Sequence, residues 1–177
     1  IPIGRGNDFA YTANIPCDVD KAVDLILSSP ATDIDVGLLY GKDAADGRFL
    51  INGAGIGFEP EVNFKASSYK HINGVASYLL AFLHCFCFIP KPYDIEMRVD
   101  DKNINLKTQQ ISICNGRRMG GAFIMGPRAI INDGKLDVVY ANRPLKRLKI
   151  TRLALRFFSG TQLKSKYMDI LNAESVV

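Results

Sequence analysis

The first residues of the chain combine an apolar run with groups that could hold a phosphate and a metal ion. Ile1-Pro2-Ile3 is followed by Gly4-Arg5-Gly6-Asn7-Asp8. Two glycines two positions apart allow positive φ angles and remove Cβ atoms where a phosphate would sit. A carboxylate beside such a loop can hold magnesium. The segment therefore predicts a strand that ends in a phosphate-binding loop, with an ordinary turn and a helix N-cap at Asp8 as the alternatives.

Three further segments add glycine, asparagine and aspartate at defined spacings. By local rules alone, Asp35 is a strand-end carboxylate in water, and Asp133-Gly134 is an ordinary turn that leads into a strand. Their order along the chain is more informative than any one of them. The segments are Ile34-Asp35-Val36-Gly37, residues 49–58 with Asn52, Gly53, Gly55 and Gly57, and residues 115–139 with Asn115-Gly116, Gly120-Gly121 and Asp133-Gly134-Lys135-Leu136-Asp137-Val138.

Taken in order, the four segments resemble the diacylglycerol kinase catalytic family, in particular the bacterial soluble lipid kinases. The resemblance covers nearly the whole chain. It implies ATP-dependent transfer of the γ-phosphate to a lipid hydroxyl such as that of diacylglycerol, with Mg²⁺ as cofactor. Two residues depart from the pattern. Arg5 replaces a threonine that contacts phosphate, although a guanidinium also binds phosphate well, and Ala122 replaces the third glycine of a triple.

The same resemblance implies roles for individual residues. Nucleotide binding falls to Gly4, Arg5, Gly6 and Asn7, and a magnesium network falls to Asp8 and Asp35. A structural magnesium is implied at the Asp133 carboxylate and the backbone oxygens of Ile130 and Lys135, a mixture of ligands that hard cations accept. No catalytic residue is expected within the chain, because the base is expected in an Asp-Gly-Glu segment beyond Val177. The 177 residues alone are therefore expected to be inactive.

Two alternatives stay open beside diacylglycerol phosphorylation. The first is a kinase of the same family that acts on a sphingoid base or another alcohol. The second is a catalytically inactive member that binds lipid or a partner protein, an alternative suggested by Arg5 in place of threonine.

Composition limits the classes of partner and compartment. The chain is 47% hydrophobic and 23% charged, as in a soluble globular protein, and its net charge of +4 does not require nucleic acid as a partner. Four cysteines without paired metal-ligand spacing indicate free thiols and a reducing cytoplasm. The most apolar stretch, residues 75–89, is shorter than the roughly 18 to 20 residues that span a bilayer. We expect a cytoplasmic protein, peripheral at the membrane.

The hydrophobic periodicity indicates a mainly β protein with helices, of the α+β class. Period-two alternation from Tyr93 to Ile113 predicts antiparallel strands with one solvated face. Residues 19–28 predict a helix with Asp18 as N-cap, and residues 75–89 predict a helix that is apolar on all sides and buried. The remaining expected strands are at 34–40, 48–56 and 135–140, with one or two more at 166–177 and a turn at Asp46-Gly47. A short helix and loop are expected at 59–69, and a helix at 144–159 with Pro144 in its first turn.

The predicted secondary structure changes near residues 30–34 from alternating strand and helix to antiparallel strands. By the resemblance, residues 1–33 are the end of an α/β nucleotide-binding domain. Residues 34–177 are then most of a β-sandwich-like lipid kinase domain.

Side chains on the predicted helices at 144–159 and 75–89 allow more than one functional interpretation. Lys146, Lys149, Arg152 and Arg156 recur at spacings of three, three and four on one helix face. They form either a solvated face or a surface that contacts anionic lipid headgroups. Phe82, Phe86 and Phe88 are either core or one wall of an acyl-chain groove. A lipid substrate and ATP are the expected partners, and a homodimer is compatible with these features.

Overall fold

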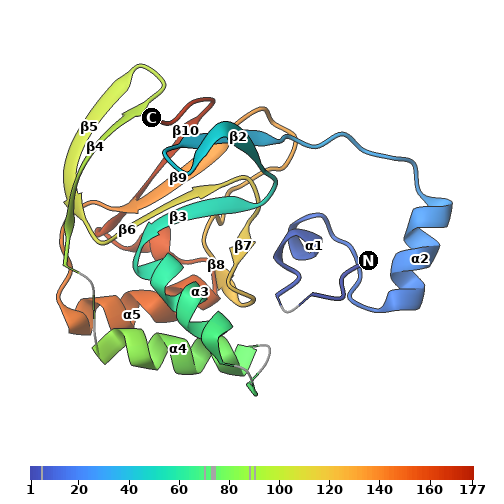
Figure 1. Ribbon diagram of the computed structural model, residues 1–177, viewed down its shortest axis with the longest axis horizontal. Helices are drawn as coiled ribbons and strands as arrows, with labels where there is room; N and C mark the ends of the chain where they lie inside the picture. The colour runs from blue at the N-terminus through green and yellow to red at the C-terminus, as the bar shows by residue number, and fades with distance from the viewer. Residues whose placement is uncertain (5, 70, 73–74, 88, 90) are drawn as a thin grey trace.

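The computed structural model describes residues 1–4, 6–69, 71–72, 75–87, 89 and 91–177 (Figure 1). Two residues singled out in the sequence, Arg5 and Phe88, lie outside this described part. The centre of the fold is a four-stranded antiparallel sheet in the order β10-β9-β6-β3. Its strands are β3 (Gly53–Gly57), β6 (Gln110–Cys114), β9 (Leu136–Ala141) and β10 (Met168–Ala173).

The central sheet is apolar on both faces, and each face has its own cover. Along β9, Val138 and Tyr140 point to one face, whereas Val139 and Ala141 point to the other. The first face packs against the hairpin of β4 (Tyr93–Val99) and β5 (Lys102–Thr108). The second face packs against helix α5 (Arg147–Phe158). This two-sided burial produces the sandwich-like architecture.

Four further helical segments surround this centre. Helix α3 (Phe58–Ser68) leaves the sheet directly after β3, and α4 (Val75–Cys87) packs against it, at the same end of the molecule as α5 (Figure 1). Near the N-terminus, α1 (Asp8–Thr12) is followed by α2 (Val19–Ser28). The Asp18 side chain caps α2 as predicted, accepting a hydrogen bond of 3.0 Å from the Lys21 amide. Two short strands, β7 (Arg118–Met119) and β8 (Phe123–Ile124), and the 3₁₀ turn η1 (Gln162–Lys164) complete the fold.

The predicted fold class is confirmed, since every strand pairing between Tyr93 and Tyr140 is antiparallel in the described part of the chain. None of the described helices is long and apolar enough to cross a bilayer. The division at residues 33 and 34 stays a prediction.

Several local predictions for the strands were wrong. Ile1–Ile3 is not a strand. The expected strand at 48–56 is two strands, because the chain bends after β2 (Ala44–Leu50) and enters a different sheet as β3. The turn lies before Ala44, and Asp46-Gly47 lies within β2 where its register against β1 (Gly37–Gly41) shifts. Gly47 has a φ of 81°, so this Asp-Gly pair serves an irregular strand and not a hairpin turn.

Two helix predictions also need correction. Helix α5 starts at Arg147, with Lys146 as N-cap, so Pro144 precedes its first turn. The reason is that Leu145 is buried, and its amide donates a 2.8 Å hydrogen bond to Gln109 Oε1. Helix α4 exists as predicted, but it is not buried on all sides, because Leu79, Leu80 and Leu83 are exposed.

The start of β3 is held by a buried asparagine from a motif that the sequence had suggested for function. Asn115 is fully buried, and its Nδ2 donates to the carbonyls of Asp35, at 2.9 Å, and Ile51, at 2.7 Å. Its amide also donates to the Asn52 carbonyl at 2.9 Å. Asn115 thus joins three segments that are distant in sequence.

We expect Asn115→Ala to lower the free energy of unfolding by about 2 kcal/mol, because two carbonyls lose their donor. Asn105→Ala, at an exposed position in β5, is the matched control and should change stability by less than about 0.5 kcal/mol. Urea denaturation of both variants makes the comparison, and equal stabilities would show that the Asn115 amide does not hold these segments together.

Candidate functional site

Asp8 is the centre of a junction between the N-terminal segment and the turn that joins β7 to β8. Its Oδ1 accepts hydrogen bonds of 3.0 Å from Arg118 Nε and from the Gly121 amide. Arg118 also donates to the Gly6 carbonyl at 2.9 Å. Both charged side chains are more than four-fifths buried, at 17% and 18% exposure, so water screens this ion pair weakly.

The glycines of the first motif permit this close approach. A Cβ on Gly6 would lie 3.0 Å from Asp8 Oδ2 and 3.4 Å from the Gly121 Cα. Gly121 itself has a φ of 76°, which favours glycine. The predicted nucleotide residues Gly4, Gly6 and Asn7 share this loop, and Asn7 holds its shape. Its Oδ1 accepts from the Gly4 amide at 2.8 Å, and its Nδ2 donates to the Pro2 carbonyl at 3.1 Å.

Asp35, the other residue of the predicted magnesium network, is held by a different loop. Its Oδ2 accepts from the Gly134 amide at 2.7 Å, and its amide donates to the Ile131 carbonyl at 2.7 Å. This loop is the one predicted to bind the structural magnesium. Asp133 is exposed there, and its Oδ1 accepts from the Lys135 amide at 3.1 Å.

Around Asp35 and the 130–135 loop, the possible metal ligands are all oxygen atoms. They are the carboxylates of Asp35 and Asp133 and the neighbouring backbone carbonyls, such as those of Ile130 and Lys135. Such a donor set suits a hard cation. In the described residues no three His, Cys, Asp or Glu side chains converge as a metal cluster would require. Both magnesium sites, at Asp8 with Asp35 and at Ile130, Asp133 and Lys135, stay predictions.

Glu59 is a candidate functional residue that the sequence reasoning missed. It is 8% exposed in the first turn of α3, where its amide donates to Gln110 Oε1 at 2.9 Å. Its Oε1 accepts from Asn63 Nδ2. Its Oε2 is buried and has no hydrogen-bond partner in the described part of the chain. Burial, with added repulsion from Asp8, raises the pKa of Glu59 to about 7.

The sequence contains one feature that points to Glu59, a glycine at position 55, but its meaning is clear only once the fold is known. A Cβ on Gly55 would overlap Glu59 Oε2, so a glycine four residues before the glutamate makes room for the carboxyl group. That glycine was assigned only to the general Gly-rich motif.

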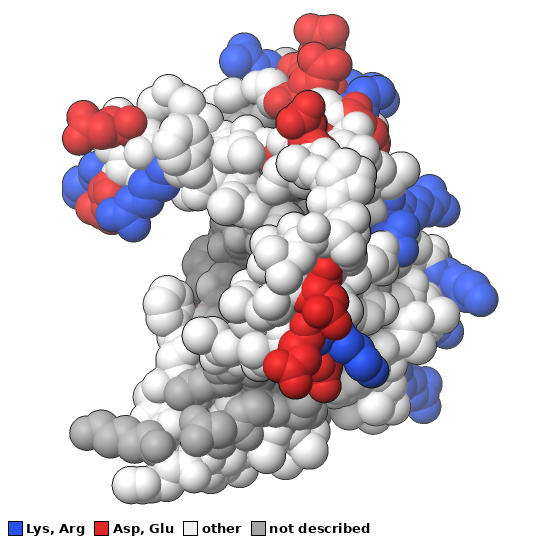
Figure 2. Space-filling view, turned by 90° about the vertical axis from the view of Figure 1, so that its right-hand side faces the viewer, with Lys and Arg blue, Asp and Glu red and all other residues white. Residues whose placement is uncertain are grey.

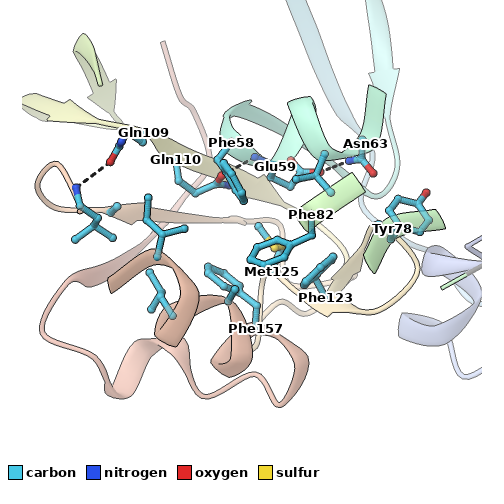
Figure 3. A pocket seen from close by; sticks show the side chains of 17 residues that line it. Phe58, Glu59, Asn63, Tyr78, Phe82, Gln109, Gln110, Phe123, Met125 and Phe157 are labelled. Carbon is cyan, nitrogen blue, oxygen red and sulfur yellow. Dashed lines mark hydrogen bonds between the residues drawn. The ribbon is translucent and has the colours of Figure 1, made fainter. Parts of the chain in front are cut away.

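Glu59 lies at one end of an apolar pocket between the sheet and helices α3, α4 and α5 (Figure 3). Phe58 and Phe82 meet edge to face across it, with ring centroids 5.7 Å apart. The cavity has a volume of about 70 Å³. The lining is mostly apolar and includes Val62, Tyr78, Phe123, Met125, Leu145, Ile150, Leu153 and Phe157, with Glu59, Asn63, Gln109 and Gln110 as its polar members.

One turn connects the polar end of this pocket to the Asp8 junction. Gly120 lines the pocket, and a Cβ there would lie 3.4 Å from Asn63 Oδ1. The next residue, Gly121, donates its amide to Asp8. Two carboxyl groups thus lie on either side of the Gly120-Gly121 turn. Chemically, Glu59 can exchange a hydrogen bond or a proton with a polar group at the end of an apolar molecule.

The predicted basic residues Lys146, Lys149, Arg152 and Arg156 are all exposed on or beside α5. Lys149 Nζ lies 4.5 Å from the centroid of the Tyr167 ring, so it contacts a side chain of this chain. Arg152 and Arg156 point away from the core on the same helix.

The raised pKa of Glu59 has a testable effect on stability. Between about pH 7 and its unfolded value of 4.5, the folded chain binds a proton that the unfolded chain does not. The free energy of unfolding should therefore gain about 2 kcal/mol from this group as the pH falls from 7.5 to 5, and Glu59→Gln should remove that gain. Urea denaturation at both pH values tests this, with the exposed Glu61→Gln as control; a wild-type pH dependence in Glu59→Gln would contradict the assignment.

Comparison with known proteins places this geometry in a family. Residues 53–177 match the family model described as the YegS C-terminal NAD kinase beta sandwich-like domain. A "Probable lipid kinase YegS-like" from Pseudomonas fluorescens (strain Pf0-1) is 32% identical over 139 residues, which are 78% of this chain and 43% of that protein. A "Probable lipid kinase YegS" from Salmonella arizonae is 33% identical over 139 residues, 78% of this chain and 44% of that protein.

The chain thus spans less than half the length of the curated relatives it matches. Among solved structures, a diacylglycerol kinase from Bacillus anthracis str. Sterne aligns with a TM-score of 0.62 at 17% identity, covering 98% of this chain and 52% of that one. This likeness shows the fold. The matched family model covers more than half of the chain, including the sheet, the pocket and the Gly120-Gly121 turn. The chain therefore belongs to the family of the YegS C-terminal NAD kinase beta sandwich-like domain.

Proposed function

We propose that this chain is part of an ATP-dependent lipid kinase that transfers the γ-phosphate of ATP to a lipid hydroxyl, such as that of diacylglycerol. The main support for the proposal is the apolar pocket, which has Glu59 at its polar end. The Gly120-Gly121 turn connects this end of the pocket to the Asp8 loop. The names of the relatives, which refer to lipid kinases, support the same class of substrate.

In this proposal the apolar part of the lipid occupies the pocket and its hydroxyl lies at Glu59. A cavity of about 70 Å³ is smaller than an acyl chain. Entry of the lipid therefore requires α4 or α5 to move outward from the sheet. Glu59 then supplies the buried oxygen without a partner, Oε2, as the hydrogen-bonding group for the hydroxyl.

The nucleotide side of the reaction is assigned to the N-terminal loop. We assign Gly4, which is exposed, and Gly6 and Asn7, which are half-buried, to the phosphates, with Arg5 between the two glycines in the sequence. Phosphoryl transfer depends chiefly on positioning and on neutralising the charge of the phosphates. Magnesium held by Asp8 and Asp35, and by the Asp133 loop, would supply that neutralisation. The ion pair with Arg118 and the hydrogen bond from the Gly121 amide hold the Asp8 carboxylate in a fixed orientation toward the β7–β8 turn.

We also assign Lys146, Lys149, Arg152 and Arg156 to contact with anionic headgroups. Helix α5 and its N-cap carry five cations, these four and Arg147, and no acidic residue, which suits a negatively charged membrane surface. A cytoplasmic enzyme, peripheral at the membrane, fits a substrate that resides in the bilayer.

The test is a lipid phosphorylation assay on the full-length protein that contains these residues. Diacylglycerol, a sphingoid base and a simple long-chain alcohol are offered with ATP and Mg²⁺. We expect Glu59→Gln to lower kcat/KM at least 10-fold, because the group that hydrogen-bonds the acceptor loses its proton-accepting oxygen. Glu61→Gln, two residues further along α3 and exposed, should retain wild-type kinetics.

Equal kcat/KM values for Glu59→Gln and Glu61→Gln would show that Glu59 does not bind the acceptor hydroxyl. Phosphorylation of the sphingoid base alone would select the alternative acceptor. ATP and lipid binding without turnover by the wild type would indicate an inactive, lipid-binding member. The 177 residues alone should give no turnover, since the parts of a phosphoryl-transfer site act as a unit.

A further inference from the structure

Helix α4 is apolar on the side that faces water. The exposed residues recur at i, i+3, i+4, i+7, i+8 and i+11, which is one continuous stripe of a helix. Three of its members are leucines with exposed fractions of 50%, 41% and 54%. We call this set the α4 outer stripe: Ala76, Leu79, Leu80, Leu83, His84 and Cys87.

The opposite face of α4 explains why the leucines are not inside. Ser77, Ala81 and Cys85 are buried, and Ala81 and Cys85 pack against Val62 and Ala66 of α3. Small side chains let the two helices approach closely. A globular helix normally places its large apolar side chains inward and polar ones outward. Here packing does not require the outer leucines, and contiguous apolar surface of this kind marks an interaction site.

Helix α5 also exposes apolar side chains, and it carries positive charge. Leu148 and Leu155 are each 67% exposed, and they alternate with Arg152 and Arg156 on the outer side. Neither α4 nor α5 contains an acidic residue. Both helices lie toward one end of the molecule in Figure 1 and line the same pocket, and the lowest part of the face in Figure 2 shows no charged residue among those described.

The same two helices enclose the apolar pocket. Tyr78 and Phe82 of α4 line it, as do Ile150 and Leu153 of α5. Whatever binds the outer sides of these helices therefore lies one helix diameter from the pocket interior.

We propose that the α4 outer stripe docks on an anionic lipid bilayer, with its leucines in the boundary between headgroups and acyl chains and the α5 arginines on the headgroups. An apolar stripe beside uncompensated cations is the pattern of an interfacial helix. A second copy of the chain fits less well, because two α5 helices would bring like charges together. This inference deepens the proposed function and rests on it for the substrate, since docking would open the pocket toward the lipid.

The test measures docking without catalysis. The full-length protein is sedimented with vesicles of phosphatidylcholine, with and without phosphatidylserine, in the absence of ATP. We expect Leu79→Glu/Leu83→Glu to reduce partitioning to the anionic vesicles at least 10-fold. The matched control is Ile26→Glu/Leu27→Glu, which adds the same charge at two exposed apolar positions of α2 and should bind like wild type.

A second measurement locates the inserted helix. These 177 residues contain no tryptophan, so Leu80→Trp introduces one at the centre of the stripe. Its fluorescence should shift to the blue when anionic vesicles are added, whereas that of Leu27→Trp on α2 should not. Arg152→Gln/Arg156→Gln should weaken binding to anionic vesicles and leave binding to neutral ones unchanged.

Wild-type partitioning by Leu79→Glu/Leu83→Glu, or an equal loss in the α2 control, would overturn the proposal. So would a wild-type dimer that fails to bind vesicles and dissociates in Leu79→Glu/Leu83→Glu, which would assign the stripe to a second copy. A short-chain, water-soluble diacylglycerol separates the two proposals. Leu79→Glu/Leu83→Glu should phosphorylate it normally, whereas failure of the kinase assignment would leave vesicle binding intact and phosphorylation absent.

Discussion

The ion pair between Asp8 and Arg118 fixes where the N-terminal loop lies relative to the sandwich-like fold. Its partners are 110 positions apart in sequence, and the pair is supported on both sides. The Tyr11 ring lies 4.4 Å from the guanidinium carbon of Arg118, and the Arg118 carbonyl accepts a 3.0 Å hydrogen bond from Asn52 Nδ2. A 2.8 Å hydrogen bond from the Arg117 amide to Thr12 Oγ1 strengthens the same junction. Together these contacts set the Gly4–Asn7 loop relative to the pocket, so that the proposed phosphate and acceptor positions can face each other.

The parts of the fold that could be predicted from the sequence are those that local patterns determine. Helix α2 begins after Asp18 because a side-chain cap is a local interaction, and the alternation in β4 and β5 reflects one exposed face. The irregular strand at Gly47 and the exposed side of α4 could not be predicted, because they depend on which surfaces meet in three dimensions. An all-apolar helix sequence is equally consistent with a buried helix and with one that keeps an apolar side free.

The candidate site was predictable only in part for the same reason. The motif residues around Asp8 do meet the Gly120-Gly121 turn. Asn115, however, satisfies backbone groups, and Asp137 accepts a 3.1 Å hydrogen bond from Asn172 across the strand pair β9–β10. Glu59 carries no motif, and its importance arises from burial beside Asp8. The spacing of residues in the sequence can therefore identify the family. Only the fold separates the residues that support the candidate site from those whose side chains are available within it.

The outward-facing leucines of α4 also bear on protein quality control. Chaperones and proteases recognise apolar surface that a folded protein would normally bury, and α4 exposes such surface within these 177 residues. With the stripe uncovered, the folded chain would resemble an incompletely folded one. The time that the protein spends uncovered in the cell would therefore influence its lifetime, independently of how stable the sandwich beneath it is.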